Sequence, residues 1–490
     1  MTARLNTLTT AGSPMAREHL HRMSGLSRMA ALALVALSAC RAEPRDAQPQ
    51  GWDEEVAIPV AVDTHPAESI VEVELEARVA QLELRPGTRT EVWTYNGGIP
   101  GPTLRARKGD TLVVHFVNHL PEPTTLHWHG LRVPAEMDGS LAMQRPIQPG
   151  ERFDYTLPLL DAGTFWYHPH FHSNAQVGNG LYGALVVEDP SEPDLGDELV
   201  LVLSDMSVRE DGSLAPPDEN GWFGDYFGRE GQLLLVNGRV RPRVRARAGV
   251  PQRWRVINAA RSRFQRFSVP GQFFFRIAGD GGLLEHHQAA AEVLLAPGER
   301  AEVFLSPQAQ GSGPVTVQWR DFDRFHLGSL RPPEDLLIFE LTGDAPGAGP
   351  KRPPATLRHI DALNLSGATV QRVELMEMMV DGKTVLAING SSQPHENPLH
   401  ARVGETQLWE VTNSTAYDHP FHLHGFFFQV LEVGGSAPVL REWKDTINVP
   451  AHQTLRFAVA YDDRPGMWMF HCHILDHAEL GMMGSLMLMR

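Results

Sequence analysis

The sequence has little cysteine, no excess of positive charge and no long hydrophobic run. Its only cysteines are Cys40 and Cys472, so a disulfide-stapled scaffold is excluded. The 43 Lys and Arg residues are outnumbered by 59 Asp and Glu residues, which gives a formal net charge of −16. Because such a chain does not attract a polyanion, we expect no nucleic-acid partner. The composition, 42% hydrophobic and 21% charged, is typical of globular chains and excludes a fibrous or disordered protein.

Residues 1–40 have the features of an export signal. Basic residues between positions 17 and 28 precede the apolar run Met29 to Leu37 and the small residues Ser38 and Ala39. The run is too short to span a bilayer, which takes about 20 residues, so this order predicts a secretory signal. The end of the run, Leu37-Ser38-Ala39-Cys40, resembles a bacterial lipoprotein box, in which the cysteine is lipidated after cleavage. The alternative is an ordinary signal peptide. We expect an exported, periplasmic or cell-envelope protein with a lipid anchor at Cys40.

Three copies of one pattern follow this signal. In each copy an Asn-Gly pair is followed by a glycine and, nine residues after that glycine, by a second asparagine. The copies begin at Asn96-Gly97, Asn237-Gly238 and Asn389-Gly390. Short strand-like segments with Gly and Pro turns, and no long helical periodicity, predict an all-β chain of three tandem β-sandwiches.

Two joints rich in proline and glycine divide the copies, at residues 189–196 and 343–354. A chain of 490 residues is expected to form two to four domains, which agrees with three repeats. We therefore predict a signal segment over residues 1–40 and three domains over residues 60–190, 197–343 and 355–490.

Histidines are concentrated in four short windows. The windows are His127-Trp-His129, His168-Pro-His-Phe-His172, His419-Pro-Phe-His-Leu-His424 and His471-Cys-His-Ile-Leu-Asp-His477. They span 21 residues and hold 11 of the 23 histidines, where random placement gives about one. A lone strand histidine is more often a hydrogen-bonded core residue than a ligand, but four clusters together indicate a metal site.

The repeat places equivalent histidines in the first and third copies only. His127-Trp-His129 and His422-Leu-His424 lie at the same offsets from the second asparagine, where the middle copy has Phe267 and Val269. The pairs His168/His170 and His471/His473 likewise follow a glycine at equal intervals. Residues i and i+2 of a strand point to one side, so each pair can aim both rings into a shared cleft. We infer that domains one and three face each other and that eight imidazoles close a metal cluster.

The third copy carries a further ligand set around Cys472. This cysteine lies between His471 and His473, so its sulfur points to the other side of the strand. His419, His477 and Met482 can join it there. Two imidazoles, one thiolate and a weak thioether are the ligands of a blue-copper electron-transfer centre.

The four windows, in this order, resemble the copper signature of the three-domain multicopper oxidases, a laccase-like family. Three further segments are similar to family segments outside the ligands: Tyr95-Asn-Gly-Gly-Ile-Pro-Gly-Pro102, Ala278-Gly-Asp-Gly-Gly282 and Trp443-Lys-Asp-Thr446. The resemblance extends over nearly all the chain after the signal. It implies three tandem cupredoxin-like Greek-key β-sandwich domains, with copper sites in the first and third.

The resemblance also implies four copper ions and their ligands. The type 1 copper falls to His419, Cys472, His477 and axial Met482, and the type 2 copper to His127 and His422. The type 3 pair falls to His129, His168, His170, His424, His471 and His473. His172 is left without a ligand role. Electrons would pass from type 1 copper through the Cys472 sulfur to His471 and His473.

The implied activity is one-electron oxidation of phenols, aromatic amines or metal ions such as Cu(I), coupled to four-electron reduction of dioxygen to water. Asp138 matches the family acid near the type 2 copper and is the expected catalytic proton donor, alongside Cys472 in electron transfer. A turn aspartate before Gly139 is the alternative reading of Asp138. Glu479 is an unproven second proton residue, and Asp418 is a hypothetical rim residue that orients the donor.

Two other functions compete with this interpretation. A copper nitrite reductase is typically a two-domain chain that builds its sites between subunits, which a third copy and paired His-x-His strands oppose. A copper-sequestering resistance protein would hold copper as cargo, and steady oxygen consumption would distinguish it from an oxidase. We expect a monomer whose partners are dioxygen and a small-molecule or metal-ion electron donor.

Overall fold

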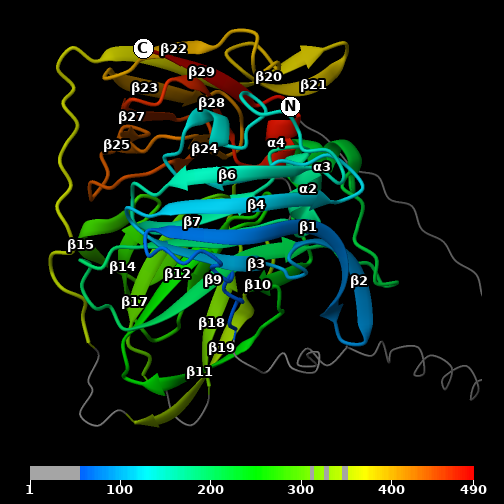
Figure 1. Cartoon of the computed structure of the whole chain (residues 1–490), viewed down its shortest axis with the longest axis vertical. Helices are drawn as coiled ribbons and strands as arrows, with labels where there is room; N and C mark the ends of the chain where they lie inside the picture. Colours follow the sequence, from blue (N-terminus) through cyan, green and yellow to red (C-terminus); the bar gives the residue numbers. More distant parts are fainter. Residues whose placement is uncertain (1–55, 309–313, 325–329, 345–350) are drawn as a thin grey trace, which may run out of the picture. The chain divides into compact units, whose positions relative to one another are not determined.

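Strands make up most of the regular structure in the computed structural model, which describes residues 56–308, 314–324, 330–344 and 351–490. In these residues the strands form six sheets, two from each third of the chain (Figure 1). The predicted class, all-β with three tandem cupredoxin-like Greek-key sandwiches, is confirmed. The predicted signal and Cys40 lie outside the described residues. No helix among the described residues is long and apolar enough to cross a membrane.

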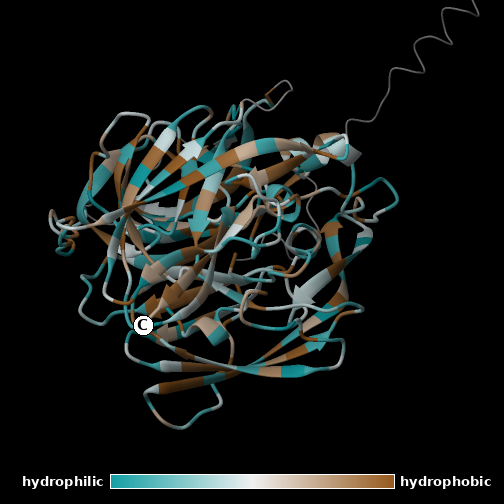
Figure 2. Ribbon diagram, turned by 90° about the horizontal axis from the view of Figure 1, so that it is seen from above, coloured by the Kyte–Doolittle hydropathy of each residue, from teal (hydrophilic) through white to brown (hydrophobic). Residues whose placement is uncertain are grey.

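The first sandwich pairs a sheet of order β2-β1-β4-β6 with one of order β3-β8-β7-β5. Its elements are β1 (Ile70–Arg85), β2 (Thr88–Tyr95), β3 (Gly101–Arg107), β4 (Thr111–His119), β5 (His127–His129), η1 (Ala135–Met137), β6 (Arg152–Pro158), β7 (Gly163–His168), α2 (Ser173–Gly178) and β8 (Gly183–Glu188). Along β4 the residues Leu112, Val114 and Phe116 are buried in alternation with more exposed ones. This period of two is that of a strand with one face on the core, and Figure 2 shows such mixed colouring along many strands.

The second sandwich has sheets of order β10-β9-β12-β17-β14-β15 and β11-β19-β18-β13-β16. Its elements are β9 (Asp197–Met206), α3 (Gly221–Phe227), β10 (Leu233–Val236), β11 (Arg243–Ala248), β12 (Gln252–Asn258), β13 (Gln265–Ser268), β14 (Phe274–Gly279), β15 (Gly282–Ala290), β16 (Glu292–Leu295), β17 (Arg300–Leu305), β18 (Val315–Arg320) and β19 (Glu334–Asp344). Phe267 and Val269 are buried in its core, where the outer copies carry histidines.

The third sandwich has sheets of order β21-β20-β23-β27-β25 and β22-β29-β28-β24-β26. Its elements are β20 (Thr369–Val380), β21 (Lys383–Ile388), β22 (Leu399–Arg402), β23 (Thr406–Asn413), β24 (His419–Leu423), β25 (Phe428–Val433), β26 (Thr446–Val449), β27 (Thr454–Ala460), β28 (Gly466–Cys472), α4 (Leu475–Glu479) and β29 (Met483–Met489). Its core contains Cys472 and Met482 together with large aromatic residues.

The repeated sequence pattern makes the same set of hydrogen bonds in each of the three copies. In each copy the second asparagine donates its Nδ2 to two backbone carbonyls and accepts a backbone N–H two residues later; these asparagines are Asn118, Asn258 and Asn413. The Asn-Gly pairs all have positive φ at both residues, which glycine and asparagine tolerate. The same bracing therefore shapes the loop before β5, β13 and β24.

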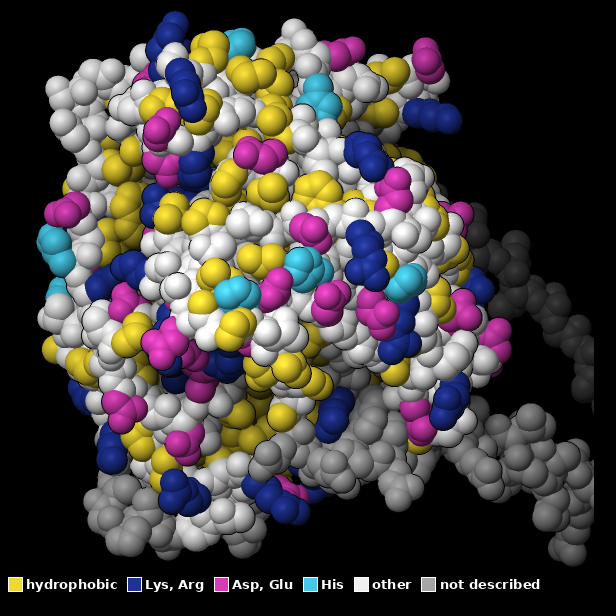
Figure 3. Space-filling view, viewed as in Figure 1, with side chains coloured by type: hydrophobic (Ala, Val, Ile, Leu, Met, Phe, Trp, Pro, Cys, Tyr) yellow, Lys and Arg dark blue, Asp and Glu magenta, His cyan; other side chains and the backbone are white. Residues whose placement is uncertain are grey.

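Buried hydrogen bonds and ion pairs join the middle sandwich to its neighbours. Glu302 is fully buried and accepts hydrogen bonds from Arg253, Arg255 and, across the boundary with the first sandwich, Thr164 Oγ1, each at 2.6 Å. Arg300 donates to both carboxylate oxygens of Asp445 in the third sandwich, at 2.7 and 2.6 Å. On the face shown in Figure 3, by contrast, acidic and basic side chains are interspersed.

Candidate metal centre

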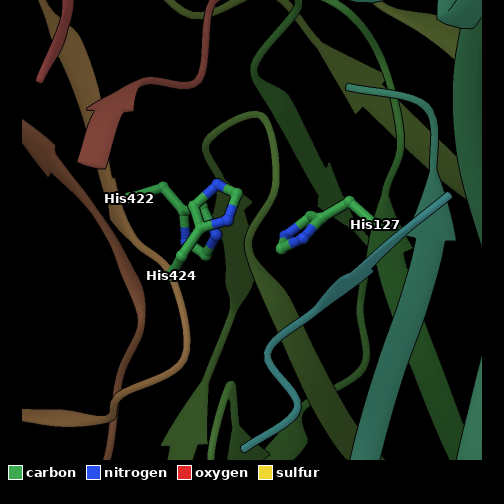
Figure 4. A group of neighbouring side chains, drawn as sticks. All are labelled: His127, His422 and His424. Atoms are coloured by element: carbon green, nitrogen blue, oxygen red, sulfur yellow. The ribbon is translucent and has the colours of Figure 1, made fainter. Parts of the chain in front are cut away.

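Eight histidines of the four windows meet between the first and third sandwiches. These residues, the histidine cluster, are His127, His129, His168, His170, His422, His424, His471 and His473. All eight are buried. Figure 4 shows His422 and His424 opposite His127, with their rings turned toward one another. The ring centroids of His127 and His424 are 3.9 Å apart.

Strand pairing sets these positions. His127 lies opposite His168 where β5 pairs with β7, and His422 lies opposite His471 where β24 pairs with β28. The two sandwiches thus present the same arrangement to each other. The middle sandwich closes the cluster at Gly298, where a Cβ would lie only 2.8 Å from the His473 ring. Glycine is therefore required at that close approach.

The outer ring nitrogens are held by backbone carbonyls. Nδ1 of each of four histidines donates to a carbonyl at 2.8–3.0 Å; the pairs are His127–Asp138, His168–Pro169, His422–Asp445 and His471–Cys472. A carbonyl only accepts, so Nδ1 carries the proton in each ring. The Nε2 atoms of these rings are left with lone pairs that point inward.

Ring nitrogens consequently face one another inside the cluster. His471 Nε2 lies 3.1 Å from His424 Nε2 and 3.2 Å from His170 Nε2. The proton of His424 is on Nδ1, which donates to Asp138 Oδ2 at 2.9 Å, so no proton lies between His424 and His471. Burial lowers the pKa of His471 to about 3 and that of His424 well below its usual value, so both rings are neutral. Neutral lone pairs converging in a buried site are the donor set that a metal ion requires.

Other inward nitrogens have no hydrogen-bond partner among the described residues. They are His127 Nε2, His129 Nδ1, His168 Nε2, His422 Nε2 and both ring nitrogens of His473. Buried polar atoms are seldom left unpaired in a folded protein. The residues present therefore fit a group of metal ions bound at the centre of the cluster.

Two carboxylates orient the cluster from outside. Asp138 Oδ2 accepts from His424, and Asp138 Oδ1 lies 3.4 Å from His127 Nδ1. Burial alone would raise the pKa of Asp138, but His424 and His127 outweigh burial and lower it well below the usual range. Asp445 Oδ1 lies 3.1 Å from His129 Nε2, which donates to it. Burial opposes ionisation of Asp445 too, but Arg300 outweighs it and lowers the pKa.

A second centre, the cysteine site, surrounds Cys472. His419 Nδ1 and His477 Nδ1 lie 3.4 and 3.5 Å from the Cys472 Sγ and 3.1 Å from each other. His477 Nε2 donates to the Tyr226 carbonyl at 3.0 Å, so its Nδ1 holds the lone pair that faces the sulfur. Met482 is fully buried in the same core, and its carbonyl accepts from Cys472 N at 3.1 Å.

The surroundings of the Cys472 sulfur favour the binding of a cation. Without a metal, burial raises the pKa of the Cys472 thiol. The Ile474 N–H donates to the sulfur at 3.4 Å, a contact that favours the thiolate. A buried thiolate beside two imidazole lone pairs is stable only with a bound cation.

Comparisons with known proteins decide the family. A multicopper oxidase family model matches residues 76–192, and a second one matches residues 363–489. The multicopper oxidase mco of Staphylococcus aureus is 30% identical over 430 residues, which cover 84% of this chain and 87% of that protein. This chain belongs to the multicopper oxidase family. It is an oxidase of the laccase-like type, and membership implies that it uses copper.

Other relatives match this multicopper oxidase over its length. The multicopper oxidase MmcO of Mycobacterium tuberculosis is 29% identical and covers 97% of this chain and 98% of its own. The solved structure of a Campylobacter jejuni multicopper oxidase, described as a metallo-oxidase, has a TM-score of 0.80 at 30% identity. That comparison covers 89% of this chain and 94% of the other.

Three other expected residues lie outside both centres of this multicopper oxidase. His172 is an exposed residue before α2. Asp418 is buried and accepts from Asn448 Nδ2 and Ala451 N, so the rim hypothesis for it is wrong. Glu479 accepts from both N and Oγ of Ser173, which ties the third sandwich to the first.

The sequence reasoning missed the residues that reach the two centres from other elements. Asp445, which accepts from His129, stands in the segment Trp443-Lys-Asp-Thr446, to which the sequence analysis assigns only a family resemblance. Tyr226 was missed because its backbone carbonyl, rather than its side chain, contacts His477. No sequence pattern identifies such a contact.

Proposed function

We propose that this multicopper oxidase couples one-electron oxidation of a reducing substrate to four-electron reduction of dioxygen to water, with four copper ions. Phenols, aromatic amines and metal ions such as Cu(I) are the substrate classes. The proposal rests on one observation: neutral imidazole lone pairs converge between two sandwiches, beside a separate cysteine site.

The contacts support a division of the ligands into sets. His170, His424 and His471 offer nitrogens within 4.8 Å of one another and form one type 3 set. His129, His168 and His473 form the other, with ring centroids 5.0–5.7 Å apart. His127 and His422 remain for the type 2 copper, with centroids 5.9 Å apart. His419, Cys472, His477 and Met482 would hold the type 1 copper.

Copper bound at these positions supplies one-electron transfer and the reduction of dioxygen. The chain itself links the two centres, because Cys472 of the cysteine site is bonded directly to His471 and His473 of the histidine cluster. The cluster's burial keeps bulk water out, and its backbone-held rings keep their lone pairs inward before any metal binds.

Asp138 is the proposed catalytic proton residue. Its lowered pKa means that it is ionised, so it must take up a proton before it can give one. A carboxylate that touches both His127 and His424 is placed to hold a proton beside the cluster. Asp138 therefore acts as a relay that also holds His424 in its tautomer.

Two measurements on copper-loaded protein test the function. Metal analysis should find four coppers per chain, and oxygen uptake should be steady with at least one donor among cuprous, ferrous, manganous and phenolic compounds. Copper binding without steady oxygen uptake would indicate a sequestering protein instead. Nitrite-dependent turnover without oxygen uptake would indicate a nitrite reductase.

We further propose that the protein is a monomer exported to the periplasm or cell envelope and anchored by lipid at Cys40. The proposed domains are residues 60–190, 197–343 and 355–490, and the observed strands of each sheet pair support these limits. Labelling of cells with a fatty-acid probe should mark the wild type and leave Cys40→Ala unmarked. Equal labelling of both proteins would remove the anchor from the proposal.

A further inference from the structure

An aromatic cluster from the middle and third sandwiches lies against the cysteine site. Helix α3 supplies Trp222, Phe223, Tyr226 and Phe227, and Tyr417 precedes β24; we call these five residues the aromatic cap. Trp222 is 60% exposed and Phe223 is 44% exposed, whereas Phe227 and Tyr417 are buried. The cap therefore runs from the surface into the core of the third sandwich.

The inner end of the cap covers both histidines of the cysteine site. The Tyr226 carbonyl accepts from His477 Nε2 at 3.0 Å. The Tyr417 ring lies 4.9 Å from the His419 ring and 5.5 Å from the His477 ring, centroid to centroid. Both histidines are fully buried, so a donor in solution cannot touch either imidazole.

The rings of the cap form a continuous path. Trp222 stacks on Tyr226 with centroids 5.1 Å apart and planes inclined by 23°, and Tyr226 meets Tyr417 edge-on at 5.1 Å. These are the preferred separations of aromatic pairs. Indole and phenol rings are also the side chains that lose one electron most readily. An exposed indole is thus connected to the buried histidines by ring contacts.

The outer surface of the cap suits an aromatic molecule better than a metal ion. Its exposed side chains, Trp222 and Phe223, offer ring faces, whereas metal ions require oxygen, nitrogen or sulfur ligands. Two acidic residues lie beside the cap: Asp225 is paired with Arg229 at 2.5 Å, and the Glu377 carboxylate interacts with the Tyr226 hydroxyl. Exposed ring faces can stack with an aromatic molecule.

We propose that Trp222 is the docking face for an aromatic electron donor, a phenol or aromatic amine, and that the electron enters the protein through the Trp222–Tyr226–Tyr417 stack. This proposal rests on the proposed function and names the substrate class of its electron-entry site. Each donor loses one electron, and a phenol also releases its proton to water and leaves as an aryloxyl radical. Four such electrons and four protons convert one dioxygen to two waters.

Three variants of the copper-loaded full chain test the proposal. Trp222→Ala removes the ring, Trp222→Phe keeps a stacking face that is hard to oxidise, and Phe273→Ala removes another exposed ring of the middle sandwich. Oxygen uptake is measured with 2,6-dimethoxyphenol and with ferrous ion, and the blue absorption band is recorded.

For the phenol, we expect Trp222→Ala to lower kcat/KM about tenfold. Trp222→Phe should keep KM near the wild-type value and lower kcat. Ferrous oxidation and the blue band should be unchanged in both, and Phe273→Ala should match the wild type throughout.

Equal phenol kinetics in Trp222→Ala and Phe273→Ala would overturn the proposal while the proposed function stands. An equal loss with phenol and ferrous ion, or a lost blue band, would also overturn it, because Trp222 would then be structural or serve metal ions. A copper-loaded wild type that consumes no oxygen with any donor would overturn both proposals.

Discussion

Because its histidines are buried, the copper-free protein is expected to lose stability as the pH falls. Burial lowers the pKa of both His471 and His477 to about 3, whereas an unfolded chain titrates near 6.5. Below pH 6.5 these rings stay neutral in the folded protein but become protonated in the unfolded chain. Their contribution to stability is therefore present above pH 6.5 and is lost as the pH falls toward 3.

The size of the effect follows from the two pKa values. When the pH falls from 7.5 to 5.5, each ring lowers the free energy of unfolding by about 1.4 kcal/mol, so the two together lower it by about 3 kcal/mol. The raised pKa of His115 acts in the opposite direction, whereas seven further buried histidines with a lowered pKa add to the effect. They are His129, His168, His170, His419, His422, His424 and His473.

Denaturant unfolding of copper-free protein at the two pH values, followed by tryptophan fluorescence, measures this loss. The variant His477→Gln lacks one of the two rings, so its dependence on pH should be smaller by about 1.4 kcal/mol. Stability that changes by less than about 1 kcal/mol between the two pH values would refute the reasoning, and so would an unchanged dependence in His477→Gln.

Three further variants have expected outcomes. Cys472→Ser should fold, because serine fits the same space, but its spectrum should lack the blue band and oxygen uptake should stop; a blue, active variant would refute the type 1 assignment. Asp138→Asn keeps an acceptor for His424 but cannot relay a proton, so kcat should fall about a hundredfold while anaerobic bleaching of the blue band by the donor keeps its rate; unchanged turnover would remove Asp138 from the proton path. Glu302→Gln removes the carboxylate that Arg253 and Arg255 share, although each keeps a second one in Glu192 and Glu198, and should cost about 1–3 kcal/mol, seen as a lower thermal midpoint. The exposed pair of Arg266 and Glu292 is the control: Glu292→Gln should cost less than about 1 kcal/mol, and equal losses in the two variants would contradict this reasoning.

Local pattern was enough to predict the class of fold and the histidine cluster. The Asn-Gly turns and bracing asparagines act within a few residues of themselves, so their meaning is visible in the sequence. A His-x-His pair on a strand presents both rings to one side whatever lies across from it. The inference that domains one and three share a site came from comparing the copies, and the structure brings the eight rings together.

Residue type alone does not predict the role of a side chain where burial decides that role. Asp418 stands beside His419 in sequence and was expected at the rim, yet it faces inward and binds Asn448 and the Ala451 N–H. An aspartate can lie in solvent or be hydrogen-bonded in the core, and only its surroundings distinguish the two. A neighbour in sequence is not a neighbour at the site when its side chain is hydrogen-bonded elsewhere.

The remaining features depend on contacts between domains, which no local pattern contains. Arg300 and Asp445 are 145 positions apart, yet their ion pair orients His129 from outside the cluster. Tyr226 reaches His477 across 251 positions through a backbone carbonyl that every residue type possesses. The sequence by itself determined the strands, the repeats and the metal-binding side chains, because these follow from periodicity and donor chemistry. Only the tertiary structure decided which carboxylates and aromatic rings surround them, because packing three sandwiches together creates those contacts.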